Sequence, residues 1–104
     1  MTTFDDRERA YESKYAHDEE MQFRANARRN KLLGLWAAGL LGKTGAEAEA
    51  YAVEVVKSDF QEAGDDDVLR KVAADLAGKA TAAEVRARMD ALLAEAKRQL
   101  AAEG

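Results

Sequence analysis

The sequence contains no cysteine, no proline and no isoleucine. Without cysteine the chain can form no disulfide, no thiolate metal site and no cysteine nucleophile, and this absence fits a reducing compartment. Proline ends helices, and the chain is instead rich in alanine, glutamate, lysine, arginine and leucine, the residues that favour them. The composition therefore predicts an all-α protein.

Long apolar runs and a strong basic excess are also missing. The longest apolar run lies near Leu35 to Leu41, which is far too short to span a bilayer. The net charge is −4 with 35% charged residues of both signs interspersed, whereas nucleic-acid-binding proteins are strongly basic. We expect one cytoplasmic domain of 104 residues with no nucleic-acid partner and no direct membrane insertion.

Glycines divide the chain into helices. Gly42, Gly64 and Gly78 lie at the expected breaks. Residues 44–47 (Thr-Gly-Ala-Glu) and 81–84 (Thr-Ala-Ala-Glu) match the capping box, and the three aspartates 65–67 can cap a third helix start. We predict a four-helix bundle over residues 20–104, with helices at about 20–41, 45–63, 66–77 and 82–102, preceded by a mobile or projecting arm over residues 1–19.

Each predicted helix has one apolar face, and these faces form the predicted core. The core residues are Leu33, Trp36, Ala37, Leu40, Leu41, Ala48, Tyr51, Ala52, Val55, Val56, Phe60, Val68, Leu69, Val72, Ala73, Leu76, Val85, Met89, Leu92, Leu93, Ala96 and Leu100. Gly34 and Gly39 inside the first helix cost about 1 kcal/mol each relative to alanine. Close packing between helices would explain both glycines.

The first 31 residues contain no leucine, isoleucine or valine, yet three aromatic residues lie among them at helical spacing. Phe4, Tyr11 and Tyr15 fall within about 40° of one another on a helix. This aromatic stripe has little to bury within the chain, so it is typical of a segment that binds as a helix in a partner's groove. Because a 12-residue helix is marginal in water, we expect the arm to be disordered in the free protein.

Other motifs reduce to structural roles. Residues 37–44 (Ala-Ala-Gly-Leu-Leu-Gly-Lys-Thr) approach a phosphate loop but lack its first glycine and its preceding strand, so we interpret them as a helix end. The basic cluster 28–31 (Arg-Arg-Asn-Lys) is interpreted as a solvated helix face or as partner salt bridges, and the aspartates as caps, not a calcium loop. His17, the only histidine, is interpreted as exposed and without a role, the alternative being a pH-sensitive junction. No catalytic or metal-ligand set is found, so we predict a binding protein, not an enzyme.

Several segments of the chain resemble a known protein family. The segments at 4–12, 14–20, 27–38, 59–60 and 62–68, above all Ala-Arg-Arg-Asn-Lys-Leu-Leu-Gly-Leu-Trp at 27–36, resemble the zeta-subunit inhibitors of alphaproteobacterial F1-ATPase. The likeness covers nearly the whole chain. Tyr11 and Tyr15 stand where phenylalanine is common in the family, which keeps the ring and adds a hydroxyl.

The resemblance implies an N-terminal segment that inserts at a catalytic alpha/beta interface of F1-ATPase, reaches the gamma rotor and blocks ATP hydrolysis. It implies a location at the F1 sector on the cytoplasmic face of the inner membrane. No cofactor is expected, although regulatory binding of ATP or ADP is a weaker implication. The implied contact residues, apolar anchors and rim charges together, are Phe4, Arg7, Glu8, Tyr11, Glu12, Lys14 and Tyr15.

Two alternatives remain at this stage. The bundle surface, and not the arm, could act as an adenine-nucleotide-responsive sensor. The chain could also be a generic helical adaptor for an unrelated protein.

Overall fold

The computed structural model describes the backbone of residues 3–59 and 65–103 and the side chains of residues 19–59 and 65–103. Every regular element in these ranges is a helix, so the predicted all-α class is confirmed. The helices are α1 (Thr3–Leu40), α2 (Gly45–Ser58), α3 (Asp66–Asp75) and α4 (Ala82–Glu103). None of them is long and apolar enough to cross a lipid bilayer.

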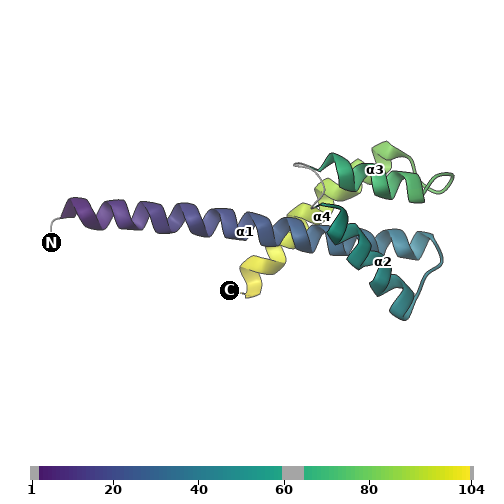
Figure 1. Ribbon diagram of the computed structural model, residues 1–104, viewed down its shortest axis with the longest axis horizontal. Helices are drawn as coiled ribbons and strands as arrows, with labels where there is room; N and C mark the ends of the chain where they lie inside the picture. The colour runs from purple at the N-terminus through teal and green to yellow at the C-terminus, as the bar shows by residue number, and fades with distance from the viewer. Residues whose placement is uncertain (1–2, 60–64, 104) are drawn as a thin grey trace.

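The longest helix, α1, projects from the body formed with the other three (Figure 1). It has 38 residues, which correspond to about 57 Å at 1.5 Å per residue. The molecule is 62 Å along its long axis. Its radius of gyration is 17.1 Å, against about 13 Å for a compact chain of this length. The C-terminal half of α1 packs in the body, and its N-terminal half extends away from it.

The bounds of three helices differ from the prediction. The helix predicted to begin near residue 20 begins at Thr3, so the backbone of residues 3–19 continues α1 without a break. The third helix ends at Asp75 and not at 77, because Leu76 has left helical geometry. The second ends at Ser58, and its predicted continuation over 60–63, which includes the core residue Phe60, lies outside the described residues.

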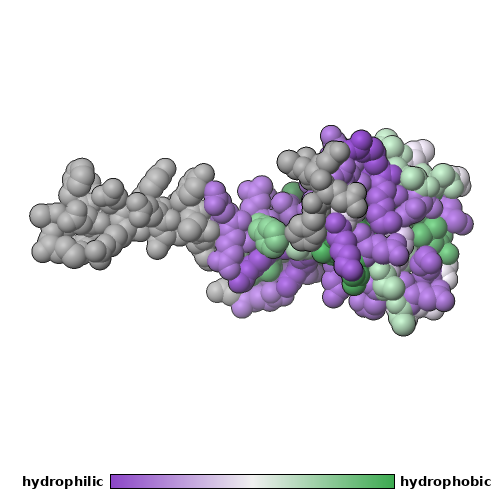
Figure 2. Space-filling model, viewed as in Figure 1, coloured by the Kyte–Doolittle hydropathy of each residue, from purple (hydrophilic) through white to green (hydrophobic). Residues whose placement is uncertain are grey.

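The core lies where the four helices meet, and most of its predicted members are buried or half-buried there. Leu40 is the clear exception, because at 40% exposure it lies beyond the packed part of α1. Trp36 packs against the core at its edge, where the guanidinium of Arg88 lies 5.1 Å from the centre of the indole ring. Hydrophilic residues cover most of the visible face of the body, and hydrophobic ones form only small separate patches (Figure 2).

The contact between α1 and α2 depends on Gly34, one of the two glycines inside α1. A Cβ atom placed on Gly34 would lie only 2.6 Å from the Cα of Ala52, so the two helix backbones approach too closely for any side chain. The close-packing explanation is therefore confirmed for Gly34. It is wrong for Gly39, whose Cβ would meet no atom within 4 Å.

The helix ends show which capping predictions hold. Gly42 has a positive φ of 76° and follows α1, and the bonds Lys43 N to Ala38 O (2.9 Å) and Gly42 N to Gly39 O (3.2 Å) form a Schellman motif. At α4, Glu84 N donates to Thr81 Oγ1 at 3.1 Å, and Thr81 N donates to Glu84 Oε1 at 3.4 Å. The second capping box is therefore present.

The first capping box is not formed. Thr44 precedes α2 with extended backbone angles, but its side chain makes no capping hydrogen bond. The sequence pattern therefore predicts the start of α2 correctly, but the predicted side-chain cap is wrong.

Candidate functional site

The predicted contact residues all lie on the first half of α1. The backbone of residues 3–18 is helical, which is the conformation that the aromatic stripe requires to place its rings on one face. The side chains of this segment are outside the described residues, so the roles of its members stay predictions. The predicted contact residues are Phe4, Arg7, Glu8, Tyr11, Glu12, Lys14 and Tyr15. The side chain of His17, interpreted from the sequence as exposed and without a role, is likewise outside the described residues.

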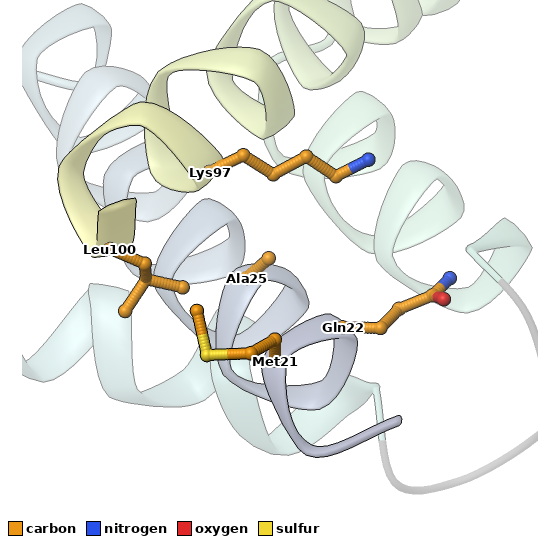
Figure 3. Close-up of a pocket in the computed structure, with 5 residues that line it drawn as sticks. All are labelled: Met21, Gln22, Ala25, Lys97 and Leu100. Carbon is orange, nitrogen blue, oxygen red and sulfur yellow. The ribbon is translucent and has the colours of Figure 1, made fainter. Parts of the chain in front are cut away.

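The projecting half of α1 leaves the body where the last turns of α4 cross it. Ala25 on α1 and Leu100 on α4 are both buried at this crossing. Met21, Gln22 and Lys97 complete the wall of a groove of about 230 Å³ (Figure 3). In that view the side chains of Met21 and Leu100 point toward one another. The crossing is thus an apolar contact with polar groups at its edge.

A bidentate ion pair closes the same crossing. Arg28 on α1 donates from Nη2 to Oε2 of Glu103 at 2.9 Å and from Nη1 to Oε1 of the same carboxylate. The hydrogen bond from Arg28 holds the pKa of Glu103 below its ordinary value. The last turn of α4 is therefore tied to α1 by charge as well as by packing.

The next residue, Arg29, is fastened to a different element. Its side chain is only 2% exposed; Nη2 donates to Oδ1 of Asp65 at 2.9 Å, and Nε donates to Oδ1 of Asn30 at 3.0 Å. Asn30 is itself fully buried. The interpretation of the basic cluster as a solvated helix face is therefore wrong for Arg29 and Asn30, which belong to the interior.

The three aspartates are also used differently from the prediction. Asp65 occupies the N-cap position of α3, but its side chain makes no capping bond. Its Oδ1 accepts from Arg29 instead. Asp66 pairs with Arg86 on α4 at 3.3 Å, and Asp67 accepts from Arg70 at 2.8 Å. The triplet therefore provides ion-pair partners, one of them for α1, while its charge still meets the positive end of the α3 dipole.

A second, more open groove lies beside the crossing. It holds about 570 Å³, and the ring of Phe23 on its wall is 61% exposed. Its other lining residues are Arg24, Ala27, Arg28, Lys31, Val56, Leu100 and Glu103. The base of the projecting helix thus combines an exposed ring with basic side chains.

The metal and phosphate motifs considered in the sequence can be compared with the described residues. Among their side chains, no group of three histidine, cysteine, aspartate or glutamate residues could hold a metal ion. The phosphate-loop-like segment is the Schellman end of α1, so its lysine and threonine occupy a helix-to-helix turn. The ion pairs of this part of the chain tie α1 to α4 and to the start of α3.

The pairs Arg28–Glu103 and Arg29–Asp65 were not predicted. They join residues 75 and 36 positions apart in the sequence, and no local spacing rule relates such residues.

Comparisons with known proteins agree with this architecture. A protein whose structure was solved by NMR in solution is 63% identical to this chain, and the match covers 81% of this chain and 99% of that one with a TM-score of 0.75. A search of curated proteins finds no match. The profile of the family described as ATPase inhibitor subunit zeta matches residues 1–99. This nearly full-length match shows that the chain belongs to the ATPase inhibitor subunit zeta family.

Proposed function

We propose that this protein inhibits F1-ATPase by inserting the first turns of α1, as a helix, at a catalytic alpha/beta interface beside the gamma rotor. The observation that carries the proposal is the projection of α1 from the body (Figure 1) in a chain of the ATPase inhibitor subunit zeta family. Such a family is regulatory, and its members bind an ATPase. The protein would act at the F1 sector, on the cytoplasmic face of the membrane that carries it.

The length of the projection supports this mode of action. From Phe4 to Tyr15 the helix rises about 17 Å, and from Tyr15 to the buried Ala25 it rises about 15 Å more. The aromatic stripe can therefore enter a groove while the body stays outside. In the partner, the anchors Phe4, Tyr11 and Tyr15 would be buried, and Arg7, Glu8, Glu12 and Lys14 would form charge pairs at the rim.

The energetics favour the rings as the main source of affinity. Buried aromatic residues at the centre of an interface often contribute about 2 kcal/mol or more each, whereas exposed charge pairs contribute less than about 1 kcal/mol. The charged residues would then set orientation and association rate.

A cross-linking experiment tests the location directly. A photoreactive phenylalanine analogue placed at Tyr11 should cross-link to the alpha, beta or gamma subunits of F1, and the same analogue at exposed Leu40 should not. Exclusive cross-linking to other proteins would contradict the proposal and favour a generic adaptor.

Adenine-nucleotide binding by the body stays a prediction. Titration of ATP while amide shifts of residues 19–59 and 65–103 are recorded would reveal a saturable site. Saturable shifts together with full activity of an arm-deleted chain would favour a nucleotide sensor over an inhibitor arm.

A further inference from the structure

The last turn of α4 contacts α1 at the point where α1 leaves the body. Leu100 is buried against α1. Three residues later, the carboxylate of Glu103 accepts hydrogen bonds from both Nη groups of Arg28. These residues face the same side because positions three apart are neighbours on a helix. The last turn of α4 thus makes one apolar and one ionic contact with α1, and we call this pair of contacts the clasp.

The clasp acts together with a second attachment. Arg29, the residue after Arg28, is tied to Asp65 ahead of α3 at 2.9 Å. Since adjacent helical residues point about 100° apart, the base of α1 is held from two directions. The turns containing Ala25 and Arg28 are therefore fixed as helix by tertiary contacts, independently of the arm beyond them.

A fixed helical base changes the cost of folding the arm. Starting a helix is unfavourable by about a thousandfold, whereas extending an existing helix by one residue is close to neutral for good helix formers. The arm can extend from these turns, which continue into the buried turns of α1 at Leu33 and Ala37, and so avoids the nucleation step. The clasp holds the turns nearest the arm. The pair Glu20–Arg24, at 2.6 Å on the intervening turn, supports this extension.

We infer that the clasp of Leu100 and Glu103 on α1 templates the helix of the N-terminal arm, so that the C-terminal turn of the chain sets the fraction of molecules whose arm is ready to bind. Arg28, Leu100 and Glu103 are then positioning residues, which act through the arm and touch no partner. The consequence for inhibition rests on the proposed function; the consequence for arm helicity does not. Apparent affinity falls in proportion to the binding-competent fraction.

The test compares E103Q with E95Q in the full chain. Glu95 is the matched control, because its carboxylate also accepts two bonds from one arginine, Arg98, but within α4. Its other oxygen accepts from Gln99 of the same helix. Carbon chemical shifts should show the helical population of residues 8–18 lowered by about twofold in E103Q and unchanged in E95Q. The charge-exchanged double variant R28E/E103R should restore it, because the exchange re-forms the ion pair between α1 and α4.

ATPase inhibition assays on the same variants separate the two claims. The inhibition constant of E103Q should rise by the factor by which its arm helicity falls. Equal arm helicity in the parent chain, E103Q and E95Q would overturn templating, as would failure of R28E/E103R to restore it while its body remains folded. Lowered helicity with unchanged inhibition would leave templating in place and contradict helical insertion of the arm. If R28E/E103R does not fold, deletion of residues 103–104 serves as the second variant, and unaltered arm helicity there overturns the inference.

Discussion

The guanidinium of Arg29, in the middle of α1, donates a hydrogen bond of 2.9 Å to the carboxylate of Asp65 at the start of α3. The arginine is 2% exposed and the aspartate 41% exposed, so the pair extends from the interior to the surface. It links the start of α3 to the helix that carries the arm. The charge of Arg29 has this carboxylate and the Asn30 side chain as its described partners.

Replacement of Asp65 by asparagine should lower the free energy of unfolding by about 2 kcal/mol, because it leaves a buried cation without its counter-charge. The value is below the range for fully buried pairs because Asp65 is partly hydrated. Chemical denaturation monitored by circular dichroism measures the change.

Asp66→Asn is the matched control for this variant. The Asp66 side chain is 79% exposed and pairs with Arg86 at 3.3 Å, so its loss should cost less than about 0.5 kcal/mol. Equal destabilisation by the two substitutions would mean that the burial of Arg29 does not increase the contribution of its ion pair to stability.

The same ion pair predicts a pH dependence of stability. The hydrogen bond and charge of Arg29 lower the pKa of Asp65 from its ordinary value of 3.8. The pair therefore stabilises the folded protein above that value, and the stabilisation is lost as the pH falls through the lowered folded-state pKa. Unfolding measured between about pH 2 and pH 6 should show a steeper acid loss for the parent chain than for D65N.

Glu95 and Glu103 also have lowered pKa values, caused by Arg98 and Arg28. Both glutamates are present in the parent chain and in D65N, so they add the same pH dependence to the stability of each protein. Parallel pH profiles for the parent chain and D65N would contradict the assignment to Asp65.

Gly34 and Gly39 should respond in opposite directions to alanine. G34A places a methyl group 2.6 Å from the Cα of Ala52, so α1 and α2 must separate, at a cost of about 1 to 3 kcal/mol. G39A meets no atom within 4 Å and should stabilise the protein by up to about 1 kcal/mol through helix propensity. Thermal melts of the two variants measure the contrast, and destabilisation of similar size in both would refute the packing account.

The fold could be predicted largely because its signals are local. Gly42 ends α1 since it adopts a φ of 76°, and the pair Thr81 and Glu84 begins α4 through bonds between residues three apart. Periodicity was sufficient to find the core. These features depend on a few neighbouring residues, so the sequence displays them directly.

What could not be predicted depends on the arrangement of helices in space. A buried arginine and an exposed one are indistinguishable in the cluster 28–31 until the positions of α3 and α4 are known. Thr44 has the capping-box spacing but lacks the side-chain bond, because spacing does not determine a rotamer. The candidate arm was located by its unusual composition, whereas the groove it would enter belongs to another protein.

The aromatic stripe should dominate inhibition. Tyr11→Ala and Tyr15→Ala are each expected to weaken inhibition of F1 by about 30-fold, equivalent to about 2 kcal/mol for the loss of a buried ring. Arg9→Ala, on another face of the helix, should weaken it by less than about fivefold. Inhibition constants for ATP hydrolysis measure the order, and a larger effect of Arg9 would remove the tyrosines from their anchor role.

Arm mobility in the free protein is a separate expectation. Backbone ¹⁵N relaxation should give low order parameters before about residue 18, and values below about 0.6 would indicate a flexible arm. Uniformly high values along α1 would instead indicate a rigid projecting helix.

The most direct test of the central claim is ATP hydrolysis by F1 in the presence of the intact chain or of a chain lacking residues 1–19. The account predicts that the intact chain inhibits hydrolysis and that the truncated chain, with its body still folded, does not. Equal inhibition by both would contradict it, because the inhibitory surface would then lie on the body.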